Sequence, residues 1–160
     1  MAGNKDVSGA RASIIDRLID MSPKVKVEVH PLKTLTRKQL RASVMRDVSW
    51  LMNTRTPLGG EDYDERELTV VDYGIPDFGS YSPENYKHKK LMAKRIARAI
   101  EIFEPRLQNV RVEFEKSMPD EKTLRYSIDA DLVVDAVREP FSFLTILQLK
   151  SGVWEVHEYE

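Results

Sequence analysis

The chain has 160 residues, a formal net charge of −1 and no cysteine. This length suits one domain with a substantial core, and the nearly balanced charge provides no overall field that would attract nucleic acid or an anionic membrane. The lack of cysteine excludes a disulfide framework and cysteine-ligated zinc.

The N-terminal residues are polar, and no apolar run in the sequence approaches the length of a membrane-spanning helix. We therefore expect a cytoplasmic protein that does not insert directly into a membrane. The composition also gives no reason to expect a nucleic-acid partner.

Residues 1–35 are predicted to form an arm that precedes the main domain. Residues 1–9 are small and polar, so we expect them to be disordered. Ser13–Met21 is typical of a short amphipathic helix, which must dock either on its own domain or in the groove of a partner. The apolar side of this helix carries Ile14, Ile15, Leu18, Ile19 and Met21. Residues 22–35, in which valines alternate between two prolines, predict an extended linker that can add an edge strand.

The first long helix is predicted to run from Thr36 to about Asn53. Thr36 and Gln39 have the spacing of a capping box, and the loop signals Thr56-Pro57 follow the end of the helix. The hydroxyl of Ser43 can face outward. The stripe that should face the core consists of Leu40, Val44, Val48, Leu51 and Met52.

No helix is expected between the two long helices. Glu61–Glu67 is predicted to be a solvated acidic loop, and Leu68–Val71 a short extended piece. Asp72–Asp77 is dense in residues that fix turns.

The second long helix should begin at Ser82-Pro83-Glu84, where a hydroxyl precedes a proline and a carboxylate. Its other faces are rich in lysine and arginine with few aromatic residues, which favours solvation or an acidic protein partner over nucleic acid. Its buried stripe consists of Met92, Ile96, Ile100 and Phe103.

After Pro105, which ends the second helix, the hydrophobic period changes from that of a helix to that of strands. The four predicted strands are Val110–Glu115, Leu124–Asp135, Phe141–Leu149 and Val153–His157. Glu139-Pro140 should interrupt the sheet between the second and third strands. Short connections favour an antiparallel order. The prediction is an α+β fold in which two main helices pack on an antiparallel β-meander of about four strands, with an extra short N-terminal helix and a main domain at residues 36–160.

Two features of this fold suggest contacts with other proteins. Glu104 and Arg106 lie at a junction between a helix and the sheet, where charges are partly covered and need partners. The terminal strand, with Trp154 and Val156, exposes unpaired backbone groups to which a strand of another chain can add. The pattern alone favours an edge protected by its own charges, Glu155 and Glu158, over strand addition.

No pattern in the sequence favours catalysis. The three histidines lack metal-ligand spacing, and the nucleophile, phosphate-loop and dinucleotide motifs are missing. A glycosidase pair of Glu104 with Asp72 or Asp77 can be nominated. A guanidinium beside Glu104, however, stabilises the ionised carboxylate and opposes its use as a proton donor. We expect no enzyme activity, no cofactor and no metal.

Three segments carry a resemblance to a known family. They are Glu104-Pro105-Arg106-Leu107 after an amphipathic helix, Asn53-Thr54-Arg55 after the first helix, and the loop Tyr73-Gly74-Ile75-Pro76-Asp77. In this order and spacing they resemble the contractile-phage baseplate wedge family, which shares an EPR motif. The N-terminal segment Ser13–Leu18 resembles the type VI secretion (TssE-like) branch of that family.

The resemblance implies a structural protein of a bacterial cytoplasmic baseplate that docks to an inner-membrane complex. It implies contacts with other baseplate wedge subunits through Glu104, Pro105 and Arg106, and through Ile14, Ile15, Leu18 and Ile19 of the N-terminal helix. It also implies that contractile sheath subunits add a strand at Trp154 and Val156. Two alternatives stay open, a muralytic (lysozyme-like) glycoside hydrolase and a stand-alone peptide-binding module.

Overall fold

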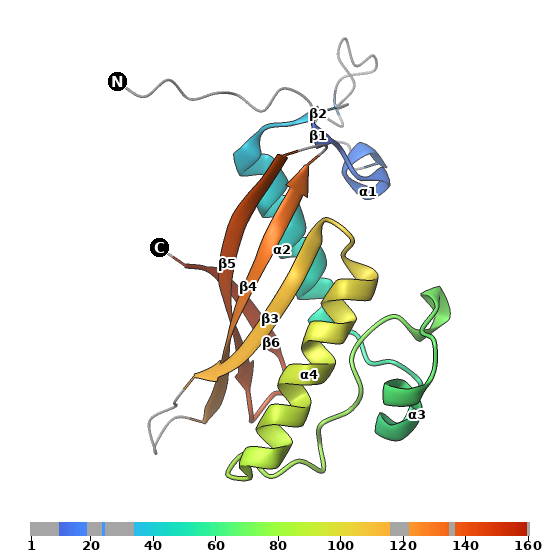
Figure 1. The fold of residues 1–160 in the computed structure, drawn as a ribbon, viewed down its shortest axis with the longest axis vertical. Coiled ribbons are helices and arrows are strands. Elements are labelled where there is room, and N and C mark those ends of the chain that lie inside the picture. Colours follow the sequence, from blue (N-terminus) through green and yellow to red (C-terminus); the bar gives the residue numbers. More distant parts are fainter. Residues whose placement is uncertain (1–9, 19–23, 25–33, 116–121, 135–136, 160) are drawn as a thin grey trace. The chain divides into compact units, whose positions relative to one another are not determined.

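The computed structural model describes residues 10–18, 24, 34–115, 122–134 and 137–159 (Figure 1). The chain divides into two compact units, residues 1–44 and 45–160. The expected division into an arm at 1–35 and a domain at 36–160 stays a prediction.

The first unit contains a two-stranded antiparallel pair, β1 (Ala10–Arg11) with β2 (Thr34–Leu35), and helix α1 (Ile14–Leu18). Ser13 and Asp16 cap α1, since the Asp16 N–H donates to the Ser13 hydroxyl at 3.1 Å and that hydroxyl donates to the Asp16 carboxylate at 2.7 Å. The predicted disordered segment, the linker valines and the predicted end of the helix beyond Leu18 lie outside the described residues.

Helix α2 (Arg37–Asn53) begins and ends as predicted. The capping box is present, because the Gln39 N–H donates to the Thr36 hydroxyl and the Thr36 N–H donates to the Gln39 side-chain oxygen. Ser43 does not face outward as expected. It is buried, and its hydroxyl donates to the Asp16 carboxylate at 2.8 Å. All five residues of the predicted stripe are buried: Leu40, Val44, Val48, Leu51 and Met52.

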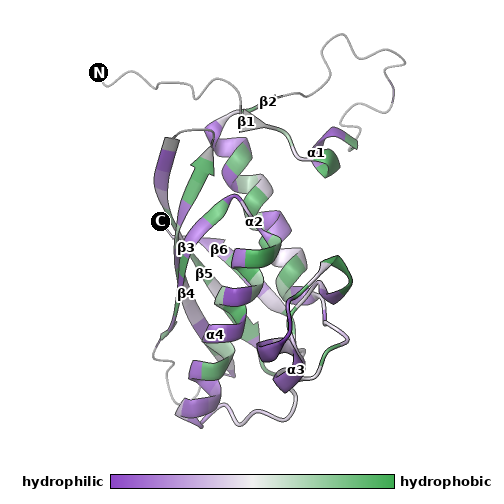
Figure 2. Ribbon diagram, turned by 45° about the vertical axis from the view of Figure 1, so that its right-hand side comes forward, coloured by the Kyte–Doolittle hydropathy of each residue, from purple (hydrophilic) through white to green (hydrophobic). Residues whose placement is uncertain are grey.

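The second unit is built on a four-stranded sheet with the order β3-β4-β5-β6, antiparallel throughout. The strands are β3 (Leu107–Glu115), β4 (Thr123–Val134), β5 (Val137–Gln148) and β6 (Trp154–Glu158). The alternation on β4 buries every second side chain from Leu124 to Leu132 and leaves the intervening ones more exposed. Helix α4 (Tyr86–Phe103) and residues 45–53 of α2 cover the buried face (Figure 2). The predicted α+β fold is confirmed.

The segment between the helices differs from prediction. Gly60–Glu65 forms helix α3 where a solvated loop was expected, because Tyr63 is fully buried and draws the acidic segment onto the core. Val70–Asp72 forms a 3₁₀ turn, η1, instead of an extended piece. The reason is a reciprocal cap, in which the Asp72 carboxylate accepts from the Thr69 N–H and hydroxyl at 2.9 Å each.

Helix α4 begins later than predicted. Its cap is Asn85, whose side chain accepts from the Lys87 N–H, and not Ser82. Pro140 lies inside β5 and does not interrupt it. This position lies beyond the part of β5 that pairs with β6, so only one side of the strand carries a ladder there, which proline tolerates.

Helix α3 is fastened to α4 by two arginines. The Arg95 side chain is buried and binds the Asp64 carboxylate through Nε and Nη2, the latter at 2.7 Å. The Arg95 hydrogen bond is the main reason why the pKa of Asp64 is lowered. Arg98 donates to the backbone carbonyls of Asp64 and Arg66. These arginines therefore hold the structure of this chain together.

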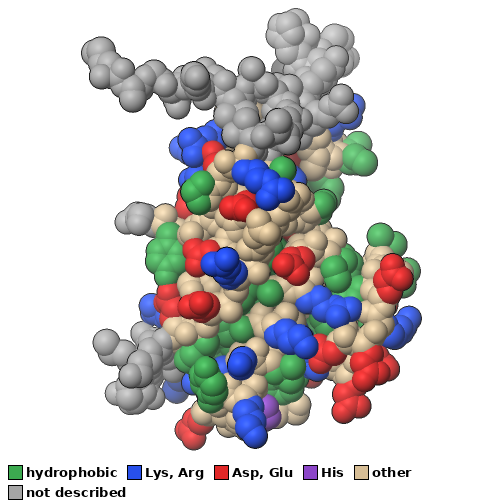
Figure 3. All heavy atoms as spheres, in the orientation of Figure 1, with side chains coloured by type: hydrophobic (Ala, Val, Ile, Leu, Met, Phe, Trp, Pro, Cys, Tyr) green, Lys and Arg blue, Asp and Glu red, His purple; other side chains and the backbone are tan. Residues whose placement is uncertain are grey.

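The lysines of α4 lie differently. Lys87, Lys90 and Lys94 are exposed and border a shallow groove whose other lining is Leu91, Ala93, Ala97 and Val112. Figure 3 shows basic side chains over α4 with apolar surface between them. An acidic protein partner on this face stays a prediction.

The Asn53-Thr54-Arg55 segment runs beside the Tyr73–Asp77 loop. The Thr56 N–H donates to the Ile75 carbonyl at 3.1 Å, and the Ile75 N–H donates to the Thr54 carbonyl at 3.0 Å. Gly74 has φ +119°, and a Cβ there would lie 2.6 Å from the Thr54 carbonyl oxygen. Only glycine fits this close approach.

We predict that Gly74→Ala lowers the free energy of unfolding by about 2 kcal/mol or more, because alanine adds both backbone strain and a clash. Chemical denaturation measures this change. Gly59→Ala is the control, since no atom lies within 4 Å of its added Cβ, and it should cost less than about 1 kcal/mol. Equal stability of the two variants would contradict the account.

Candidate functional site

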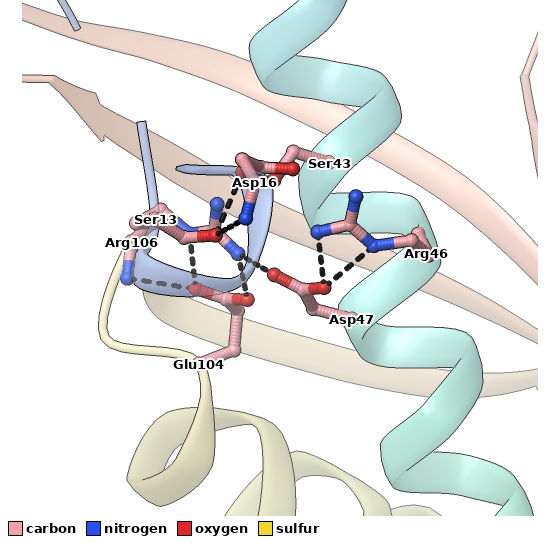
Figure 4. A network of polar contacts seen from close by, with 7 residues as sticks. All are labelled: Ser13, Asp16, Ser43, Arg46, Asp47, Glu104 and Arg106. Atoms are coloured by element: carbon pink, nitrogen blue, oxygen red, sulfur yellow. Dashed lines mark hydrogen bonds and ion pairs between the residues drawn. The ribbon is translucent and has the colours of Figure 1, made fainter. Parts of the chain in front are cut away.

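Three side chains form a charged corner where α4 gives way to β3: Asp47, Glu104 and Arg106 (Figure 4). Pro105 ends the helix, and Glu104 is its C-terminal cap. The Glu104 carboxylate is buried, with the residue 3% exposed. It accepts from Arg106 Nε at 2.7 Å, from Nη2 at 2.5 Å and from the Arg106 backbone N–H at 3.3 Å. Glu104 and Arg106, which flank Pro105, therefore form a bidentate ion pair with each other.

Helix α2 supplies the second anion of the corner. Arg106 Nη2 also donates to Asp47 Oδ2 at 2.5 Å, and Asp47 Oδ1 accepts from Arg46 Nη2 at 2.8 Å. Burial disfavours the charged form of Arg106, but the hydrogen bonds and charges of Glu104 and Asp47 outweigh burial and raise its pKa. The buried Glu104 carboxylate and the partly exposed Asp47 carboxylate thus each bind a guanidinium.

The Tyr73–Asp77 loop lies beside the corner. The Tyr73 ring packs edge-on against Phe103 at 5.3 Å between centroids. Burial, and then the negative charges of Asp47 and Glu104, raise the pKa of the Tyr73 phenol. Pro105 is exposed, and the Arg106 side chain keeps 21% of its surface accessible. The outer surface of the corner can thus be touched by another protein without unpacking it.

Strand β6 forms the second candidate surface. It is the last strand of the sheet, with no further strand beside it among the described residues. The Trp154 side chain is 2% exposed and packs near Phe78 and Tyr126, so it belongs to the core of this chain. Val156 is half-buried. Of these two predicted site residues, Trp154 therefore reaches the edge only through its backbone.

Sequence reasoning missed one residue at this edge, Asn53. Its side-chain Nδ2 donates to the Trp154 carbonyl at 2.9 Å, and its Oδ1 accepts from the Trp154 N–H at 3.0 Å. Arg55 adds a bond from Nη2 to the Gly152 carbonyl at 3.3 Å. The family resemblance had singled out Asn53-Thr54-Arg55, but no local pattern connects a residue with another one 101 positions away.

The N-terminal helix belongs to the first unit and carries the third candidate surface. Ile14, Ile15 and Leu18 are 74%, 44% and 78% exposed, and Asp16 on the same helix is buried. Ile19 lies outside the described residues. The apolar side chains predicted to bind a partner are accessible to one.

The carboxylates nominated for hydrolysis have local roles. Asp72 caps the turn η1, and Asp77 accepts from the Gly79 N–H at 3.2 Å, while Glu104 binds Arg106. The part of the chain that the structure describes holds no cluster of side chains suited to a metal ion. It also contains no helix that is both long and apolar enough to cross a bilayer.

A family comparison agrees with the resemblance to baseplate wedge proteins. One solved structure, described as "The baseplate complex from the type VI secretion system", contains a chain that is 17% identical, with a TM-score of 0.48; the match covers 69% of this chain and 96% of that chain. No curated protein matches this sequence. A family described as "Baseplate wedge protein gp25" matches residues 38–137, which is more than half of the chain. The chain belongs to the baseplate wedge protein gp25 family.

Proposed function

We propose that this protein is a structural component of a type VI secretion baseplate, located in the cytoplasm and docked with the baseplate to the inner-membrane complex. Family membership supports the baseplate role, and the resemblance of Ser13–Leu18 to the TssE-like branch supports the secretion system. The observation that carries the proposal is the charged corner, in which the Arg106 guanidinium forms ion pairs with both Glu104 and Asp47. Such a corner is suited to presenting a fixed surface and not to proton transfer.

The charged corner is the proposed contact with other wedge subunits. Pro105 and the accessible part of Arg106 form its outer surface, and the internal ion pairs fix their position before any partner arrives. A prearranged surface loses little conformational entropy on binding, which favours affinity. Glu104 contributes indirectly, since it is buried and positions Arg106.

We predict that Arg106→Ala destabilises the protein and abolishes co-purification with wedge subunits. Removal of the guanidinium leaves buried Glu104 without its partner, which should cost about 2–4 kcal/mol in the free energy of unfolding, at the lower end because Arg106 is partly exposed. Pro105→Ala, which removes no buried group, should stay folded and still weaken the contact. The control Arg138→Ala removes an exposed guanidinium that binds Asp131 at 3.8 Å and should change neither property. Normal co-purification of both Arg106→Ala and Pro105→Ala with wedge subunits would contradict the proposed contact.

Helix α1 is the second proposed wedge contact. Its exposed Ile14, Ile15 and Leu18 present apolar area that water does not favour, on a helix of five residues that is capped at its start. Burial of one such side chain contributes about 1.5–3 kcal/mol. Ile19 is proposed to continue this surface.

We predict that the double variant Ile14→Gln, Leu18→Gln keeps the unfolding free energy within about 0.5 kcal/mol, because both side chains are exposed. Its affinity for wedge subunits should fall at least about tenfold, since two apolar contacts are lost. Titration of purified wedge subunits measures the change. Arg17→Gln, on the same helix and also exposed, is the matched control and should bind as the unmodified chain does; equal affinities in all three would reject this contact.

Strand β6 is the proposed template for the contractile sheath, whose subunits would add a strand to its outer edge. Strand addition obtains affinity from main-chain hydrogen bonds and needs an edge with unpaired groups. The Gln148 N–H donates to the Val153 carbonyl at 2.9 Å, so Val153 faces β5. Backbone groups alternate in direction along a strand, so those of Trp154 and Val156 point away from β5. The groups of Trp154 bind the Asn53 side chain, so Val156 is the proposed attachment point.

We predict that Val156→Pro leaves the protein folded and prevents it from seeding sheath polymerisation. Proline removes an N–H that points outward, so the ladder between β5 and β6 keeps its hydrogen bonds. Val156→Ala retains that N–H and should seed normally, which separates backbone pairing from side-chain contact. Sheath growth on purified baseplates, followed by electron microscopy, is the measurement. Sheaths that start on the proline variant at the normal rate would exclude this edge.

A further inference from the structure

The outer edge of β6 is not uniform. The side-chain amide of Asn53 occupies both backbone groups of Trp154, donating to the carbonyl at 2.9 Å and accepting from the N–H at 3.0 Å. An amide that pairs in this way takes the place that a peptide group of a neighbouring strand would fill. The edge is therefore closed at Trp154, while Val156, the next residue that points outward, has no such side chain bound to it among the described contacts.

Three further interactions stabilise the pairing of the Asn53 amide with Trp154. The second N–H of the Asn53 amide donates to the Ser49 carbonyl at 2.9 Å, within α2. The buried Trp154 ring fixes the start of β6 in the core. Arg55 joins the Met52 carbonyl at the end of α2 to the Gly152 carbonyl in the turn before β6. Neither the amide nor the strand can move away without breaking other contacts.

An added strand needs such a device to set its register. A hairpin fixes register through its turn, whereas a strand from another chain has no turn, and shifts of two residues retain the same pattern of backbone hydrogen bonds and the same facing of side chains. A strand shifted toward Trp154 would have to displace the Asn53 amide or leave its own backbone groups unpaired, which is costly.

We infer that Asn53 is a strand stop that fixes the register in which a sheath strand pairs with β6. The inference rests on the proposed strand addition. The occupant is an extended segment of the sheath subunit, which pairs from Val156 onward and turns away before Trp154.

Disulfide mapping tests the stop, because the chain contains no cysteine. The whole chain carrying Val156→Cys is assembled with a sheath subunit whose candidate terminal strand carries single cysteines, one position at a time. Residues opposite each other across the added pair lie within the range of a disulfide, and positions two residues away do not. In the otherwise unmodified chain, cross-linking should be confined to one position of the sheath strand.

With Asn53→Ala, cross-linking should spread to the position two residues along, because the shifted register is no longer blocked. The matched control is Arg55→Ala, which loosens the same hairpin at Gly152 but leaves the amide on Trp154, and it should retain the single position. Amide hydrogen exchange gives a second readout without the sheath: the Trp154 N–H should be protected in the unmodified chain and lose protection in Asn53→Ala.

A single cross-linked position that persists in Asn53→Ala overturns the strand stop and leaves strand addition standing. A spread in Arg55→Ala equal to that in Asn53→Ala also overturns the stop, since general loosening would then explain it. Cross-linking at no position, even in the unmodified chain, overturns strand addition itself and the stop with it.

Discussion

A single buried carboxylate governs the junction between the helical and sheet halves of residues 45–160. Glu104 has only 3% of its surface accessible, and a lone charge in that position would be untenable without partners. Arg106 donates hydrogen bonds to this carboxylate from its side chain and its backbone N–H. The Arg106 guanidinium also donates to Asp47 on α2. The end of α4, the start of β3 and the helix α2 are thereby fixed to one another through one guanidinium.

The Asn53-Thr54-Arg55 segment joins the remaining parts of the same unit. Thr54 accepts a backbone hydrogen bond from Ile75, next to the glycine that allows the close approach. Asn53 and Arg55 bind the backbone of Trp154 and Gly152. The three segments that resemble the baseplate wedge family are thus packed around the end of α2 and the corner. Glu104-Pro105-Arg106 forms the ion pair, Gly74 permits the close backbone approach, and Asn53-Thr54-Arg55 binds the sheet edge.

The sequence predicts what depends on local periodicity. The stripe on α2, the alternation on β4 and the proline that ends α4 each follow from spacing alone, and the structure confirms them. Helix α3 was missed because a single buried tyrosine, Tyr63, outweighs a run of acidic residues. The pairing of Glu104 with Arg106 is close in sequence and could be anticipated. Asp47, 59 residues from Arg106, and Asn53, 101 residues from Trp154, could not, because only the tertiary fold brings them to their partners.

The position of Asp47 and Asn53 on one helix has a mechanical consequence. Six residues of α-helix span about 9 Å along the axis, and a hydrogen-bonded helix resists changes in that length. Asp47 fixes the corner proposed to bind wedge subunits, and Asn53 fixes the edge proposed to bind the sheath. The last two turns of α2 therefore set the distance between the two surfaces. A load applied at the proposed β6 edge would reach the proposed wedge contact through this helix as well as through the sheet, whose strand β3 begins next to Arg106.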